Sequence, residues 1–154
     1  SRNEEEYNKI AVVLAEILSI IPGNCAVFFP SYYIKDKIRQ YINPGKKVFD
    51  ENKKLKKEEK NALIEDFKKY KDKGAVLLAV ASGNFGEGID LPGDFLKAVI
   101  IVGLPLNQPD LEIKSLIDYF DRKFNRGWDY GYIYPAFNKT LQNAGRCIRS
   151  ETDK

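Results

Sequence analysis

The C-terminal stretch of this 154-residue chain carries side chains suited to binding phosphate. Gln142, Arg146 and Arg149 follow one another at spacings of four and three residues, which suits one face of a helix. A guanidinium is permanently charged and forks onto two oxygens at once, so two arginines one turn apart can spread over a single triphosphate. The amide of Gln142 can orient a water molecule. The alternative interpretation is a surface helix with two solvated arginines.

A glycine-rich loop follows the clearest apolar run. Residues 81–93 read Ala-Ser-Gly-Asn-Phe-Gly-Glu-Gly-Ile-Asp-Leu-Pro-Gly, which indicates a backbone that turns sharply and lies close to another molecule. The loop is not a dinucleotide-binding GxGxxG, because Leu91 stands where the third glycine is needed, and GxxxxGK[ST] occurs nowhere in the chain. The sequence therefore predicts a domain that does not hold a triphosphate by itself. An ordinary tight loop is the alternative.

The amino-acid composition argues against metal binding and against histidine-dependent catalysis. The chain has no histidine and only two cysteines, Cys25 and Cys147, neither with a partner at metal-ligand spacing. We therefore expect no metal site here, no Ser-His-Asp or Cys-His catalysis, and two buried, inert thiols. No apolar run approaches the roughly 20 residues of a membrane span, and the acidic N-terminus is unlike a secretory leader. A cytoplasmic protein, or a nuclear one in a eukaryote, is expected.

Charge is concentrated in one segment. The formal charge of the chain is only +3, but residues 46–73 carry eleven lysines against seven acids. Such a run is usually a solvated helix face and less often a nucleic-acid patch. The 44% apolar content is that of one globular domain with a real core.

Apolar patterns predict an alternation of strands and helices. Wholly apolar runs predict buried strands at residues 26–29, 76–80 and 98–102, with a brief strand at 47–49. Apolar residues at three-and-four spacing predict a first helix whose core face is Ile10, Val13, Leu14, Ile17, Leu18 and Ile21. Further helices are expected at residues 31–41, up to Gly74, at 113–124 and from Pro135 onward, while residues 130–134 are ambiguous. The default topology is a doubly wound α/β sheet, whose ligands gather at the carboxyl ends of the strands.

The motifs, in this order, resemble those of superfamily 2 helicases. Residues 83–90, Gly-Asn-Phe-Gly-Glu-Gly-Ile-Asp, are similar to motif V, and residues 142–150, Gln-Asn-Ala-Gly-Arg-Cys-Ile-Arg-Ser, to motif VI. Residues 27–32, Val-Phe-Phe-Pro-Ser-Tyr, look like motif IV, and residues 146–153 look like an extended motif VI. The resemblance covers residues 25–154. It points to the XPD family of iron-sulfur DNA helicases, with its DinG and FANCJ branches.

This resemblance implies the second of two RecA-like motor domains. The expected fold is a three-layer α/β/α domain with a mostly parallel sheet, P-loop NTPase-like but lacking the P-loop, over residues 1–154. In the family, ATP and Mg²⁺ are held mainly by the first motor domain, and that domain also carries the Walker motifs and the iron-sulfur cluster. We therefore expect the chain alone to be inactive, and its final core strand and helix to be missing.

The resemblance also implies roles for the motif residues on the ATP side. Arg149 would be the arginine finger on the γ-phosphate, Arg146 its neighbour that locks the closed cleft, and Gln142 a contact to the γ-phosphate or the attacking water. Asp90 would accept from the ribose or orient the finger. The remaining nucleotide-side residues of motif V are Glu87 and Gly88, which would couple this end to the DNA.

On the DNA side, Ser31 and Tyr32 would contact backbone phosphate, Asn84 would touch nucleic acid and the Phe85 ring would stack on a base. The implied function is that of an ATP-dependent 5′–3′ DNA helicase motor in DNA repair, monomeric, with single-stranded DNA and the first motor domain of its own chain as partners and no membrane. One alternative is a non-catalytic nucleic-acid-binding module that uses residues 46–73 and motif V. Another is a flavodoxin-like domain for a nucleotide or flavin, which would share the sheet but not the paired arginines.

Overall fold

Four short strands form the centre of the molecule. The structure, a computed structural model, describes residues 2–86, 95–106 and 108–145. The strands are β1 (Cys25–Phe29), β2 (Lys47–Asp50), β3 (Ala75–Val80) and β4 (Ala98–Ile101), in the sheet order β2-β3-β1-β4 with every pairing parallel. Each predicted strand is confirmed to within one residue at either end. β1 and β3, the wholly apolar runs at the centre of the sheet, are buried at every position. The prediction of a buried strand at 98–102 is wrong in its burial, because β4 is an outer strand of the sheet and is only half-buried.

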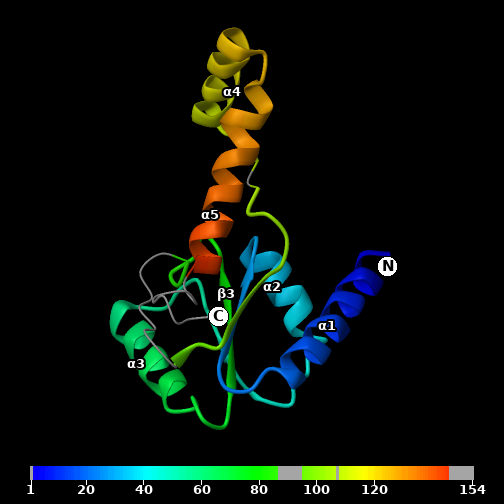
Figure 1. Cartoon of the computed structure of the whole chain (residues 1–154), viewed down its shortest axis with the longest axis vertical. Helices are drawn as coiled ribbons and strands as arrows, with labels where there is room; N and C mark the ends of the chain where they lie inside the picture. The colour runs from blue at the N-terminus through cyan, green and yellow to red at the C-terminus, as the bar shows by residue number, and fades with distance from the viewer. Residues whose placement is uncertain (1, 87–94, 107, 146–154) are drawn as a thin grey trace.

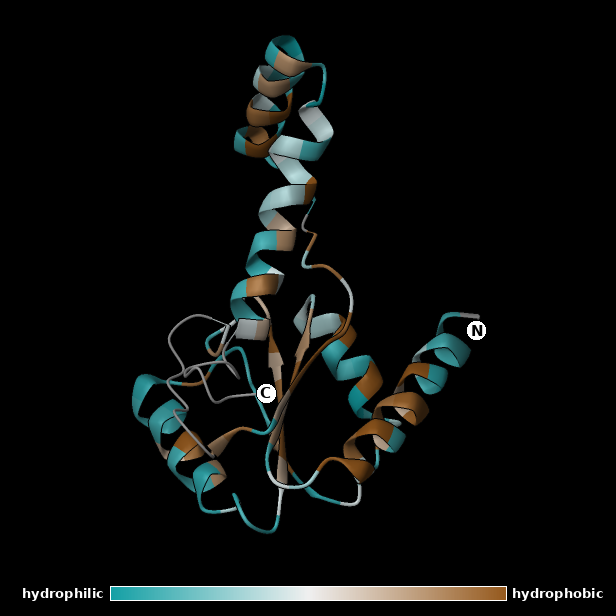
Figure 2. Cartoon of the chain, viewed as in Figure 1, coloured by the Kyte–Doolittle hydropathy of each residue, from teal (hydrophilic) through white to brown (hydrophobic). Residues whose placement is uncertain are grey.

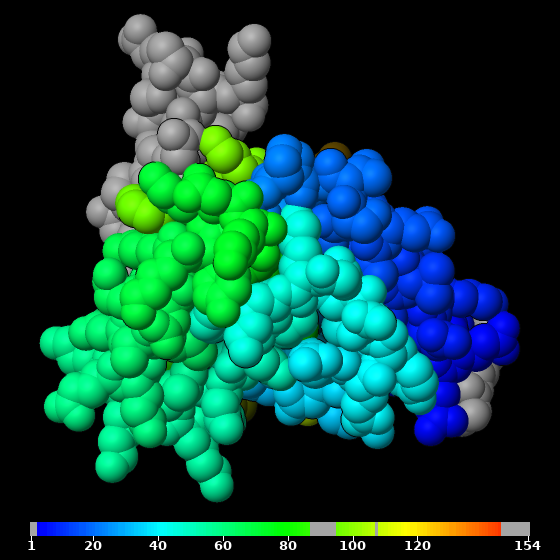
Figure 3. Space-filling model, turned by 90° about the horizontal axis from the view of Figure 1, so that it is seen from below, coloured from blue at the N-terminus to red at the C-terminus, as the bar shows by residue number. Residues whose placement is uncertain are grey.

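Helices cover both faces of the sheet (Figure 1). Val27 and Phe29 of β1 pack on the side of α1 (Arg2–Ile20) and α2 (Tyr32–Arg39), while Ala26 and Phe28 pack on the side of α3 (Lys57–Lys68). Seen from below, the blue and cyan residues of the chain's first third lie on one side and the green residues that follow lie on the other (Figure 3). The predicted three-layer arrangement with a parallel sheet is confirmed.

The first helix is longer than its apolar pattern and buries a narrower stripe. Leu14 and Leu18, with Ala11, are buried against the sheet, whereas Val13 and Ile17 are exposed. The prediction that all six apolar positions form the core face is therefore wrong for these two, because the stripe is wider than the area the sheet covers. Figure 2 shows this apolar character spread over α1.

Two predicted helix ends are also corrected. Helix α2 ends at Arg39 rather than Tyr41, and α3 ends at Lys68, well before Gly74. Residues 69–73 form turns, and Gly74 follows with a φ of +84°, a left-handed conformation that favours glycine.

The C-terminal helices form an arm that projects beyond the carboxyl ends of the strands (Figure 1). We use "the arm" for α4 (Leu111–Phe124), the π-helix η2 (Asp129–Ile133) and α5 (Tyr134–Ala144). The ambiguous residues 130–134 are thus mostly π-helical, and Pro135 lies in the first turn of α5, as predicted. No residue of α4 is buried, and its apolar face packs mainly on η2.

Candidate functional site

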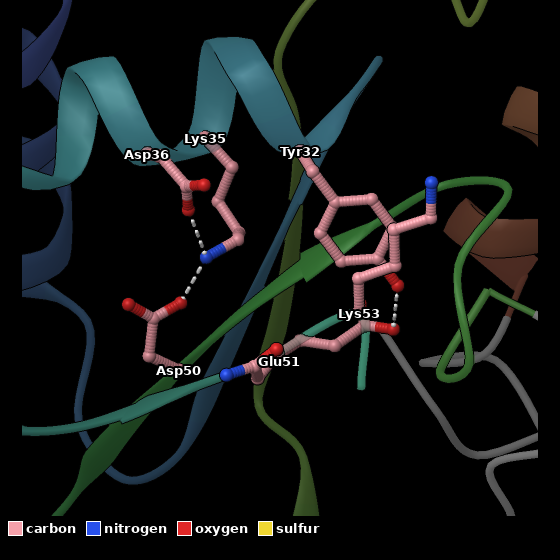
Figure 4. A pocket seen from close by; sticks show the side chains of 7 residues that line it. Tyr32, Lys35, Asp36, Asp50, Glu51 and Lys53 are labelled. Carbon is pink, nitrogen blue, oxygen red and sulfur yellow. Dashed lines mark hydrogen bonds and ion pairs between the residues drawn. The ribbon is translucent and has the colours of Figure 1, made fainter. Parts of the chain in front are cut away.

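The carboxyl ends of β1, β2 and β3 bring three loops together. Two adjacent hollows of about 400 and 480 Å³ lie here, and both are lined by Tyr32 and Lys53. The first hollow is also lined by Lys35, Asp36, Asp50, Glu51 and Asn52 (Figure 4), and the second by Ser82, Gly83 and Asn84. The candidate site thus lies at the strand ends that the topology predicts.

Glu51, the residue after β2, lies at the centre of this edge with only 1% of its surface exposed. Its Oε1 accepts hydrogen bonds from the Tyr32 hydroxyl at 2.8 Å and the Phe85 backbone N–H at 3.4 Å. Its Oε2 accepts from the Val80 N–H at 2.7 Å. One carboxylate therefore joins the start of α2, the end of β3 and the loop that follows it.

The loop after β3 fits against this carboxylate without spare room. A Cβ on Gly83 would lie 2.6 Å from Glu51 Oε1 and 2.7 Å from the Tyr32 hydroxyl oxygen. A Cβ on Gly86 would overlap the Ala81 carbonyl. The glycines are needed here for close packing within the domain, which accounts for part of the loop's glycine content without any ligand.

Ser31 and Tyr32 begin α2 at the edge of the hollows. Ser31 is the N-cap, and its hydroxyl accepts from the Ile34 N–H at 3.3 Å. Burial, with the hydrogen bond to Glu51 second, raises the pKa of Tyr32 to about 12. The phenol is therefore a protonated donor throughout the physiological pH range.

A buried lysine ties α2 to β2 beside these groups. The Lys35 ammonium is 2% exposed, pairs with Asp36 at 2.8 Å and contacts Asp50, as Figure 4 shows. Arg39 adds a longer pair to Asp50 at 3.6 Å. Because the ammonium is enclosed and paired with two carboxylates, it fixes α2 in place.

The two predicted DNA contacts of the glycine loop have different environments. Asn84 lines the second hollow and is partly exposed, and its carbonyl contacts the Lys60 ammonium. The Phe85 ring is fully buried in the core cluster on the α3 side, with Lys60 Nζ 5.4 Å from its centroid. The prediction that Phe85 stacks on a base is wrong for this structure, because the ring offers no free face.

Helix α5 is docked onto the same loop. Asn143 is fully buried, and its Nδ2 donates to the Ala81 carbonyl at 3.4 Å. The preceding residue, Gln142, is exposed on α5. The structure therefore brings the start of the motif VI segment against Ala81, two residues before the motif V segment.

Five predicted site residues lie outside the described residues: Arg146, Arg149, Glu87, Gly88 and Asp90. Cys147 is also outside them, whereas Cys25 is fully buried and burial raises the pKa of its thiol, as expected for an inert cysteine.

Sequence reasoning missed Glu51 and Asn143. Glu51 stands in the polar run Asp-Glu-Asn-Lys-Lys, which reads as a solvated loop. Its one usable signal was its position directly after a strand, at the edge where Ser31 and Ala81 also lie. No sequence signal indicated that Asn143 is buried, because the residues around it in the helix are a mixture of polar and apolar types and do not mark a buried face.

The lysine-rich segment 46–73 does not form one surface. Lys46 contacts the Ile21 and Gly23 carbonyls, the latter at 3.1 Å, at the amino ends of the strands. Lys53 lines the hollows at the carboxyl ends instead. The segment therefore divides its charge between opposite edges of the sheet.

A parallel sheet with helices on both faces, whose glycine loop and C-terminal helix meet at its carboxyl edge, defines a RecA-like α/β domain. Solved structures agree: an XPD helicase superposes with a TM-score of 0.76 at 27% identity over 98% of this chain and 27% of that one, and an apo XPD gives 0.76 at 28%. Residues 14–154 match the family model described as the helicase C-terminal domain, and the chain belongs to that family.

Curated relatives carry matching names. The chain is 30% identical to the ATP-dependent DNA helicase XPD of Sulfolobus acidocaldarius over 99% of its length, and to the ATP-dependent DNA helicase DinG of Photobacterium profundum over 97%. It is also 30% identical to a Fanconi anemia group J protein homolog of Gallus gallus over 97% of its length. It spans 27%, 22% and 13% of those three proteins. The predicted resemblance to the XPD, DinG and FANCJ group is confirmed.

Among the described residues, no helix combines the length and apolar content that crossing a membrane requires.

Proposed function

We propose that this chain is the second motor domain of an ATP-dependent DNA helicase. The observation that supports this best is the buried contact of Asn143 with the Ala81 carbonyl. It holds the helix that leads to Arg146 and Arg149 against the loop that leads to residues 87–90. The two segments that lead to the proposed nucleotide-binding residues are thus in contact at Asn143 and Ala81.

The donor set suits the γ-phosphate end of ATP. Gln142, exposed on α5, supplies an amide, and Arg146 and Arg149 supply permanent positive charge that forks onto phosphate oxygens. Asp90, with Glu87 and Gly88, would serve the ribose side. ATP supplies the phosphoryl group whose hydrolysis drives the motor, and Arg149 would neutralise charge that develops on it.

The chain lacks a Walker A sequence, so we expect no ATP hydrolysis by the chain alone. A first motor domain in the same protein would hold most of the nucleotide and its Mg²⁺, and an iron-sulfur cluster would belong to that part of the protein. Further expectations are 5′–3′ polarity, a monomer, and a cytoplasmic or nuclear location.

The hollows at the carboxyl edge suit the backbone of single-stranded DNA. Ser31 and Tyr32 offer hydroxyls at the start of α2, Asn84 offers an amide, and exposed Lys53 adds a positive charge. Such groups position a phosphate backbone without reading its sequence. Phe85 has no part in this contact, because its ring is buried.

The test is Arg149→Ala in the full-length protein, with steady-state ATP hydrolysis measured in saturating oligo(dT). We expect turnover to fall about 10³- to 10⁵-fold while the affinity for ATP is largely kept, because a finger acts mainly in the transition state. Arg149→Lys should recover little, since an ammonium lacks the planar fork.

The matched control is Arg122→Ala, which removes an exposed arginine from α4 in the arm. It should leave turnover within about twofold, since surface changes away from a site have small effects. If Arg149→Ala behaved like Arg122→Ala, the assignment of Arg149 as a finger would be wrong. Oligo(dT) binding without any hydrolysis by the full-length wild type would instead favour the non-catalytic module.

A further inference from the structure

The Glu51 carboxylate has no role in the proposed function so far, yet it is the most enclosed acid at the site. It is 1% exposed, and the donors that satisfy it are a phenol and two backbone N–H groups. A buried carboxylate is costly unless its hydrogen bonds are kept, so this arrangement resists change in any one of its partners.

Each donor belongs to a different part of the site. Tyr32 starts α2 on the proposed DNA side, Val80 ends β3, and Phe85 lies in the loop that leads to residues 87–90. The loop is also tightly packed, because a Cβ on Gly83 would lie within 2.9 Å of both Glu51 carboxylate oxygens. Displacement of the Tyr32 hydroxyl would therefore change the hydrogen bond of the Phe85 N–H, because both groups donate to Oε1.

We propose that Glu51 is a positioning residue that couples DNA contact at Tyr32 to the placement of the loop before residues 87–90. The inference rests on the proposed function for its two ends, but the link itself lies within this domain. When a phosphate oxygen accepts the hydrogen bond of the Tyr32 hydroxyl instead, the Phe85 N–H is the one remaining donor to Oε1. The hydrogen bond between Phe85 and Glu51 then strengthens and holds the loop closer to the carboxylate. By linkage, nucleotide binding that favours one placement of residues 81–86 would in turn change the affinity for DNA.

The variant that isolates this link is Glu51→Gln in the full-length protein. The amide keeps the volume of the acid but replaces one acceptor by a donor. If its oxygen faces Val80, its NH₂ group can donate to the Tyr32 hydroxyl, and the Phe85 N–H then loses its acceptor. Hydrogen exchange should accordingly speed up by about tenfold or more at the loop of residues 81–86 and much less within β3.

The functional measurement is the ratio of oligo(dT)-stimulated to basal ATP hydrolysis. We expect Glu51→Gln to lower this ratio about tenfold, within the range of typical couplings between sites. The matched control is Glu65→Gln, the same substitution at an exposed acid of α3 that pairs with Lys68 and lines neither hollow, and it should keep the wild-type ratio. A reduced melting temperature for Glu51→Gln with an unchanged ratio would mean that Glu51 is only structural and would overturn the proposal.

Tyr32→Phe keeps the two backbone bonds of Glu51 and tests the link if Glu51→Gln fails to fold. Tyr32→Phe alone should lower the ratio too. Where Glu51→Gln folds, adding it to Tyr32→Phe should have a smaller effect than in the wild type, because both act through one contact. Full additivity, or a wild-type ratio in Tyr32→Phe, would overturn the proposal. The hydrogen-exchange experiment needs no ATP hydrolysis. Unchanged exchange at residues 81–86 in Glu51→Gln would disprove the coupling through Glu51. Absence of ATP hydrolysis in the wild-type protein would disprove only the assignment as a motor domain.

Discussion

The sheet with its three helices and the arm are built from similar residues but are stabilised in different ways. β1 and β3 are buried at every position, and the core holds Phe28, Phe29, Phe67 and Phe85. The arm has exposed aromatic residues instead, and most of them contact a neighbouring ring in edge-to-face or tilted geometry: Tyr119, Phe124, Trp128, Tyr130 and Tyr134. Figure 2 shows apolar residues in both regions.

The difference shows that apolar content alone does not give a core. The residues of β1 and β3 are covered from both sides, whereas α4 contacts mainly η2 and leaves its other faces exposed. Close approach in the arm depends on glycine, because Gly127 and Gly131 lie against the backbone of Ile117. The sheet region should therefore carry the global stability of the chain and the arm a local one.

The same substitution in each region tests this directly. Phe67→Ala should lower the free energy of unfolding by about 3–5 kcal/mol, because a fully buried ring is replaced by a cavity. Phe124→Ala, at a residue that is 53% exposed, should cost about 1 kcal/mol or less. Urea denaturation of both variants measures the difference, and equal losses would show that the arm belongs to the same cooperative core.

A smaller effect is expected for Gly127→Ala in the arm. Its Cβ would overlap the Ile117 carbonyl, so α4 must shift, at about 1–3 kcal/mol. Hydrogen exchange should report faster opening of α4 and η2 with little change in β3. In Gly145→Ala, no described atom lies within 4 Å of the new Cβ and φ is −62°, so this control should change stability by no more than about 0.5 kcal/mol.

The smallest effect concerns pH and the Tyr32 phenol. Its pKa is about 12 when folded and near the ordinary 10.0 when unfolded, so between these values the folded state holds the extra proton. Stability should therefore fall as pH rises through this window, and Tyr32→Phe should lack this part of the loss. Urea unfolding at about pH 9 and about pH 11 compares the two proteins, and an identical loss in both would contradict the assignment.

Much of the fold was predictable from local patterns. Wholly apolar runs at residues 26–29 and 76–80 have few alternatives to buried parallel strands, and Pro135 marked the last helix. The π-helix was not predictable, since no residue pattern distinguishes it from an α-helix, and it forms where Gly131 meets α4. The inward face of α1 was overestimated because exposure depends on what the sheet covers.

The candidate site, like the fold, has features that were predictable from local sequence and features that were not. Residue types at fixed spacings are enough to predict the motif residues from Ser31 to Arg149, the absence of a P-loop and the family. The burial of Glu51, the place of Phe85 in the core and the contact of Asn143 with Ala81 follow from tertiary packing instead. Each of these depends on contacts between segments that are distant in the chain, such as Glu51 with Val80, 29 residues away, and Asn143 with Ala81, 62 residues away. Local spacing does not record such long-range contacts.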